Sequence, residues 1–93
     1  MNMRRRRKDL VVRAVGADML VLDLQSQRIH QLNPTASFIW KNCDVASSPA
    51  EIAALLAFEF DVAQDVAIQD VQRALEMLQA LKLIVVEEAP SDV

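Results

Sequence analysis

The sequence contains very little glycine, cysteine and histidine, and these shortages exclude several kinds of protein. Among 93 residues there is one glycine, one cysteine and one histidine, and there is no tyrosine. The lone Cys43 excludes an internal disulfide and fits a reducing compartment. No apolar run approaches the roughly 20 residues that span a bilayer, and the basic N-terminus is not followed by the apolar segment of a signal peptide. We therefore expect a cytoplasmic protein.

The same shortages argue against catalysis. His30 and Cys43 cannot supply the roughly four nitrogen or sulfur ligands that a structural zinc site takes. Cys43 lies on the apolar stripe of an expected helix, where a buried thiol is usually inert. Gly16, the single glycine, cannot form a glycine-rich phosphate loop. The sequence predicts a protein that is not an enzyme and binds neither a metal nor a cofactor.

The residues that are present suit one small folded domain. Hydrophobic residues make up 53% of the chain and charged residues 25%, which is typical of a globular protein. The length allows one domain and not two. We expect a flexible basic arm over residues 1–9, a single domain over residues 10–86 and a frayed acidic tail over residues 87–93.

Three short strands are predicted in the first third of the chain, at Leu10–Val15, Met19–Leu24 and Arg28–Leu32. In the second strand three alternating leucines share one face and Asp23 lies on the other. The turns Gly16–Asp18 and Gln25–Gln27 are short, which favours an antiparallel meander. In a meander the second strand is central, and the first and third strands are edges.

Three helices are predicted after the strands, and two of them have clear start signals. Asn33 caps the first helix and Pro34 occupies its first position. This helix should end near Asp44. Ser48 and Glu51 form the capping box of the second helix.

The third helix is the longest, from about Ala63 to Leu81, and Leu83–Val86 follows as a short extended tail. The buried stripe of the third helix is formed by Val71, Ala74, Leu75, Leu78 and Leu81. The chain is therefore predicted to be an α+β domain. A three-stranded antiparallel sheet is followed by a three-helix bundle, which is the grouping of a winged helix-turn-helix.

The edge strand Arg28–Leu32 carries the functional prediction. An edge strand presents unpaired N–H and C=O groups, and here Arg28 is the only charge that could block them. An extended peptide can add there as a further strand, with main-chain hydrogen bonds giving affinity and pockets for alternate side chains giving specificity. Met77 on the third helix is either an adaptable apolar wall of such a site or a core filler.

Two other functions fit the same elements. A DNA-binding regulator of the winged-helix class would place the third helix in the major groove. The charges around that helix are mainly acidic, with Arg73 and Lys82 against Asp65, Asp70 and Glu76. Such a helix repels phosphate, and only the arm Arg4–Lys8, otherwise a solvated segment, favours nucleic acid. The third possibility is a structural module that forms a homodimer through edge-strand pairing or domain swapping.

Three groups of residues stand in a characteristic order: Leu32-Asn33-x-Thr35-Ala36 with Ile39-Trp40, Ile52–Phe60 with Asp61-Val62, and Asp70-Val71 with Leu75-x-x-Leu78. Together they resemble the PqqD family over nearly the whole chain, from Val11 to Val86. The founding member of that family is the peptide chaperone of pyrroloquinoline quinone biosynthesis. The same fold recognises leader peptides in many pathways for ribosomally made, post-translationally modified peptides.

The resemblance implies a non-catalytic peptide chaperone with two partners and with no metal or cofactor. One partner is a precursor peptide, whose leader would lie along the third strand and the third helix, with Arg73 pairing with leader carboxylates. The other is a modifying enzyme, often a radical S-adenosylmethionine protein. The peptide-binding residues expected on this basis are Arg28, Ile29, His30, Gln31, Leu32, Arg73, Ala74, Met77 and Leu81.

The chain departs from the family pattern at places where glycine is usual. Val45 follows the Asp at the end of the first helix, and Lys82 stands near the end of the third. The hairpin Gln25–Gln27 also contains no glycine. These positions are expected to differ from the family in the geometry of their turns.

Overall fold

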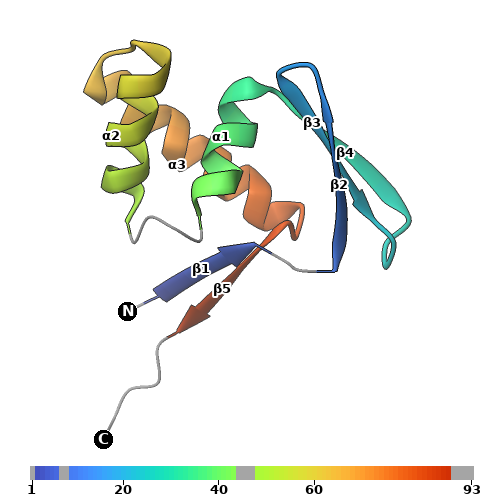
Figure 1. The fold of residues 1–93 in the computed structure, drawn as a ribbon. Helices are drawn as coiled ribbons and strands as arrows, with labels where there is room; N and C mark the ends of the chain where they lie inside the picture. The colour runs from blue at the N-terminus through green and yellow to red at the C-terminus, as the bar shows by residue number, and fades with distance from the viewer. Residues whose placement is uncertain (1, 7–8, 44–47, 89–93) are drawn as a thin grey trace, which may run out of the picture.

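The computed structural model describes residues 2–6, 9–43 and 48–88. Its elements are β1 (Asn2–Arg6), β2 (Leu10–Val15), β3 (Asp18–Asp23), β4 (Arg28–Leu32), α1 (Pro34–Asn42), α2 (Pro49–Phe60), α3 (Gln64–Ala80) and β5 (Ile84–Glu88). Three antiparallel strands, β2 to β4, are followed by three helices, which confirms the predicted α+β fold. The sheet lies at one end of the molecule, α2 lies at the other, and α1 lies between them (Figure 1).

Strand β3 is the centre of the meander, with β2 and β4 antiparallel on either side. Its side chains alternate as expected, but Met19, Val21 and Asp23 form the buried face. The leucines at 20 and 22 lie half-buried on the outer face. Asp23 tolerates burial because its Oδ1 accepts hydrogen bonds from the backbone N–H groups of the following turn, at Gln25 and Ser26.

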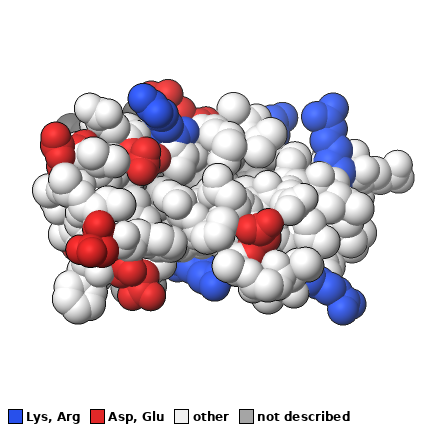
Figure 2. Space-filling view, turned by 90° about the horizontal axis from the view of Figure 1, so that it is seen from above, with Lys and Arg blue, Asp and Glu red and all other residues white. Residues whose placement is uncertain are grey.

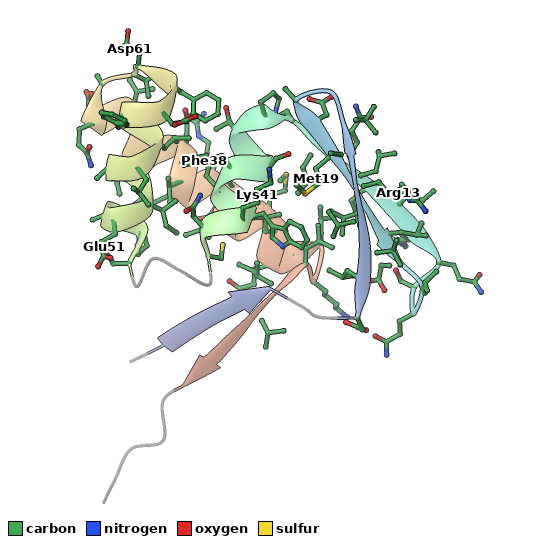
Figure 3. The ribbon with its side chains drawn as sticks, viewed as in Figure 1. Arg13, Met19, Phe38, Lys41, Glu51 and Asp61 are labelled. Atoms are coloured by element: carbon green, nitrogen blue, oxygen red, sulfur yellow. The ribbon has the colours of Figure 1, made fainter. Side chains whose placement is uncertain are left out.

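The predicted helix caps are confirmed. Asn33 Oδ1 accepts a hydrogen bond from Ala36 N at 2.8 Å at the start of α1. Ser48 Oγ accepts one from Glu51 N at 3.2 Å, and Glu51 lies at the lower end of α2 in Figure 3. Helix α1 ends at Asn42, and the expected end near Asp44 lies outside the described residues. Helix α3 is within one residue of its predicted bounds at each end.

The core lies between the three helices and the inner face of the sheet. Its largest fully buried side chains include Trp40, Leu32, Leu56 and Leu78. The Trp40 indole N–H donates to the carbonyl oxygen of Leu83 at 3.0 Å. This bond satisfies the only polar atom of the ring and ties α1 to the segment that follows α3.

The prediction of a flexible arm over residues 1–9 is wrong for Asn2–Arg6. These residues form β1, which pairs antiparallel with β5, so that Arg5 stands opposite Val85. The short extended segment predicted at Leu83–Val86 therefore continues as a strand to Glu88. The pairing brings together the two ends of the described chain. Residues 89–93 of the predicted tail lie outside the described residues.

On the face seen in Figure 2, acidic and basic residues are unevenly distributed. Figure 2 shows most of the Asp and Glu side chains over the left half of the molecule, which holds α2 in Figure 1. Lys and Arg dominate at the right end, where the sheet lies.

Among the residues that the structure describes, three other than glycine have a positive φ, namely Gln27 at 59°, Asp61 at 53° and Lys82 at 62°. Asp61 ends α2 in the left-handed conformation, and Lys82 follows the end of α3. Gln27 closes the turn between β3 and β4. Gln27 lies in the hairpin, and Lys82 at the helix end, for which the resemblance to the family implies a glycine. Both residues are held in a strained conformation.

Replacing Gln27 with glycine is expected to stabilise the fold. The change removes a left-handed strain of about 1–2 kcal/mol, less about 0.5–1 kcal/mol for the added freedom of the unfolded chain. Urea unfolding of Gln27→Gly and Ser26→Gly measures the effect, because Ser26 in the same turn is not among the residues with a positive φ. The prediction is wrong if both variants lose stability equally.

Candidate functional site

Strand β4 is an edge of the three-stranded sheet. It pairs with β3 on one side, and no strand in the described part of the chain pairs with the other side. Leu32 is buried and His30 is half-buried, so these two side chains face the helices. Ile29 is 66% exposed and lies on the outer face. The predicted edge is therefore open within the described residues.

The turn between β2 and β3 indicates which backbone groups of β4 face outward. Val15 and Asp18 flank a two-residue turn in which Gly16 has a positive φ, the geometry of a tight hairpin, so these two residues form a hydrogen-bonded pair. In an antiparallel pair, opposite residues direct their N–H and C=O groups either at each other or both away, and the two arrangements alternate along the strand. Since Asp18 faces β2, we infer that Met19 and Val21 face their partners Leu32 and His30 in β4. Ile29 and Gln31 then direct their backbone groups away from β3, toward the open edge.

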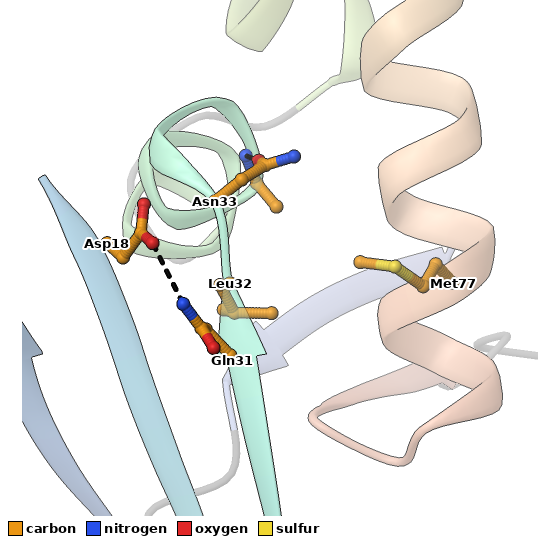
Figure 4. A pocket seen from close by; sticks show the side chains of 6 residues that line it. Asp18, Gln31, Leu32, Asn33 and Met77 are labelled. Carbon is orange, nitrogen blue, oxygen red and sulfur yellow. Dashed lines mark hydrogen bonds between the residues drawn. The ribbon is translucent and has the colours of Figure 1, made fainter.

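A groove runs beside this strand, between β4 and the start of α1 on one side and α3 on the other. It consists of two adjoining hollows of about 270 and 290 Å3. Asn33, Ala36 and Met77 line both. Figure 4 shows Met77 reaching from α3 toward Leu32 and Asn33. We call this feature the groove; its remaining lining residues are Asp18, Gln31, Leu32, Thr35, Asp70, Arg73 and Ala74.

The groove exists because small side chains lie where α1 and α3 come together. Ala36 of α1 and Ala74 of α3 both line the second hollow, and a larger side chain at either place would fill it. Met77 is 40% exposed and forms an apolar wall that can change shape. The groove can therefore take an apolar side chain without rearrangement of the core.

Charged and polar groups stand at both ends of the groove. At the sheet end, Gln31 Nε2 donates a hydrogen bond to Asp18 Oδ2 at 2.9 Å (Figure 4). At the other end, Arg73 and Asp70 line the hollow formed by α1 and α3. The groove thus has an apolar middle and offers both signs of charge to a bound chain.

The structure brings five of the nine expected peptide-binding residues together in the groove, which are Gln31, Leu32, Arg73, Ala74 and Met77. Arg28, Ile29 and His30 lie on the same strand but do not line either hollow. Leu81 is half-buried and packs against the core. Peptide binding by all nine residues stays a prediction.

Five residues of the groove were missed from the sequence, namely Asp18, Asn33, Thr35, Ala36 and Asp70. Asn33 and Ala36 were read only as a cap and as core, and they do serve in those ways. The available signal was the small size of Ala36 and Ala74 on two helices that must pack together. A pairing of small residues predicts a hollow only once the packing of those helices is known.

The described residues contain no group of three or more His, Cys, Asp and Glu side chains placed to hold a metal ion. Cys43 is buried, and its thiol donates to the carbonyl oxygen of Ile39 at 3.2 Å. None of the helices in the described part of the chain is long and apolar enough to cross a membrane. What the site offers is backbone hydrogen bonding beside an apolar hollow.

Solved structures have a similar fold. One is TbiB1 in complex with the TbiA(beta) leader peptide, with a TM-score of 0.74 and 22% identity over 95% of this chain and 99% of that chain. Another is lasso peptide synthetase B1 complexed with the leader peptide, with a TM-score of 0.75 and 28% identity over 88% and 96%. At 22% identity, the match to TbiB1 shows a similar fold and no more.

The sequence model of the family described as coenzyme PQQ synthesis protein D (PqqD) matches residues 18–84. The chain belongs to the PqqD family. A comparison with curated proteins gave no match. The matched segment contains β3, β4 and all three helices, and therefore every element that lines the groove.

Proline substitutions in β4 test which backbone groups face outward. His30→Pro removes an N–H that we infer pairs with β3, whereas Gln31→Pro removes one that faces the open edge. His30→Pro is expected to lower the free energy of unfolding by about 1 kcal/mol more than Gln31→Pro, the value of one net hydrogen bond. Thermal unfolding of both variants measures this difference. Gln31→Ala and His30→Ala serve as controls for the side chains, and a larger loss in Gln31→Pro would reverse the assignment.

Proposed function

We propose that this protein is a non-catalytic peptide chaperone that binds the leader of a ribosomally made precursor peptide. The leader adds to β4 as a further antiparallel or parallel strand and lies in the groove. The single observation that carries the proposal is an open strand edge placed directly beside an apolar hollow. Membership of the PqqD family and the leader peptides bound to two similar structures support it.

Recognition divides between the backbone and two kinds of side chain. The outward N–H and C=O groups of Ile29 and Gln31 bind the leader backbone, whatever its sequence. An apolar leader side chain enters the hollow beside Met77 and Ala74, where full burial of a leucine-sized group contributes about 1.5–3 kcal/mol. Arg73 pairs with a leader carboxylate at the end of the groove.

The chaperone acts by holding the peptide for a modifying enzyme, which we propose is of the radical S-adenosylmethionine type. A leader bound at β4 leaves the rest of the precursor attached through a flexible linker. Such tethering raises the local concentration of the modified segment to about the mM range for short linkers. No metal or cofactor on this chain takes part, and the binding takes place in the cytoplasm.

Titration of the isotope-labelled chain with synthetic leader segments tests this function. The peptides are taken from short reading frames beside the gene, and amide shifts are followed by NMR. Shifts confined to residues 28–33 and α3 are expected. Ala74→Leu fills the hollow and should weaken binding about tenfold or more, the effect of losing one buried apolar contact. Leu24→Ser, at an exposed position just after β3 and outside the groove, should leave leader binding unchanged.

Three results would contradict the proposal. The first is the absence of shifts at saturating peptide. The second is a set of shifts produced by duplex DNA instead of peptide, which would favour the DNA-binding alternative. The third is concentration-dependent pairing of β4 between two copies in sedimentation, which would make the edge a dimer interface. Thermal unfolding of Ala74→Leu separates loss of binding from loss of fold.

A further inference from the structure

Helix α2 is apolar on the side that faces solvent as well as on the side that faces the core. Its buried residues are Ile52, Ala53 and Leu56, which pack where α2 meets α1 and α3. Phe58 lies on the opposite side of the helix and is 89% exposed, and Leu55 lies on the flank at 44%. Apart from Glu51 and Glu59, the residues of α2 are apolar, and apolar helix faces are normally covered. Phe58 and Leu55 therefore form an apolar surface that is not covered.

The exposed phenylalanine is not needed for packing within the chain. Phe60, two positions further on, makes an edge-to-face contact with Phe38 of α1, with ring centroids 5.5 Å apart. Residues two apart on a helix point to nearly opposite sides, so Phe58 points away from that contact. Exposed aromatic side chains in an apolar surface mark binding sites for other proteins.

The charged residues that border the exposed apolar surface are all acidic. Residues 48–72 contain five Asp and Glu and no Lys, Arg or His. Glu59, Asp61 and Asp65 are exposed, and Asp61 lies at the upper end of α2 in Figure 3. Nucleic acid, an anionic membrane and the same face of a second copy would each bring negative charge against this border. A basic partner is favoured.

We propose that Ala54, Leu55 and Phe58, which we call the α2 stripe, dock a second protein that presents apolar side chains within a rim of Lys and Arg. Identifying that protein as the modifying enzyme rests on the function proposed above. The molecule is 43 Å long, and α2 lies at the opposite end from the sheet (Figure 1). The α2 stripe and the groove can therefore be occupied at the same time.

Two amphipathic helical peptides of about four turns serve as probes of the α2 stripe. Both carry leucine on one face; the other face carries lysine in one peptide and glutamate in its twin. The lysine peptide is expected to shift the amides of residues 54–62 of the labelled chain, and the glutamate peptide is not. Phe58→Ser should weaken binding of the lysine peptide by about tenfold or more. Leu24→Ser, which removes an exposed leucine elsewhere, should leave that binding unchanged.

The proposal is overturned if both peptides bind equally or if Phe58→Ser changes nothing. It is also overturned if sedimentation shows a dimer of the wild-type chain that Phe58→Ser abolishes, because a second copy would then cover the α2 stripe. Failure of the leader titration has a different signature, since it concerns amides 28–33 and responds to Ala74→Leu. If only that titration fails, the α2 stripe stands as a docking surface while the reason to identify its partner as the modifying enzyme is lost.

Discussion

The junction between β4 and α1 determines the relative positions of the elements that form the site. Over six residues the chain changes from a strand to a helix, and three hydrogen bonds hold the change. Asn33 contributes two, since its Oδ1 accepts from Ala36 N and its carbonyl oxygen accepts from Ser37 N, each at 2.8 Å. The Leu32 carbonyl oxygen accepts the third from Ser37 Oγ. Because these bonds fix the angle at which α1 leaves the edge strand, they fix where α1 meets α3 and hence where the groove opens.

A second hydrogen bond fixes the position of α1 relative to α3. The Trp40 indole reaches across the core to the Leu83 carbonyl oxygen, which lies just beyond the end of α3. One helix is thus attached to β4 at its start and to the segment after α3 near its end. Both walls of the groove are held by the same short helix, α1. A change that tilts α1 would therefore alter the groove without touching any residue that lines it.

Features that depend on neighbouring residues could be predicted from the sequence. The caps at Asn33 and Ser48 and the edge position of β4 are of this kind, because each follows from local bonding or from short turns. Pairing of β1 with β5 joins the two ends of the chain, and local patterns contain no signal for it. The hollow above Ala36 and Ala74 depends on how α1 packs against α3. Only the part of the groove that β4 forms could therefore be predicted. The left-handed residues Gln27 and Lys82 lie in the hairpin and at the helix end where a different turn geometry was expected.

The two proposed binding surfaces, β4 with the groove and the α2 stripe, differ in how they distinguish between ligands. Backbone groups along β4 bind any extended chain, so they supply affinity without discrimination. Selection among leaders must come from the groove, which has space for few side chains. A chaperone that selects its peptide weakly gains specificity if it also selects its enzyme, because only the correct pair then meets on one molecule. Under the two proposals the α2 stripe supplies that second selection through apolar contact and charge, at the end of the molecule remote from the peptide.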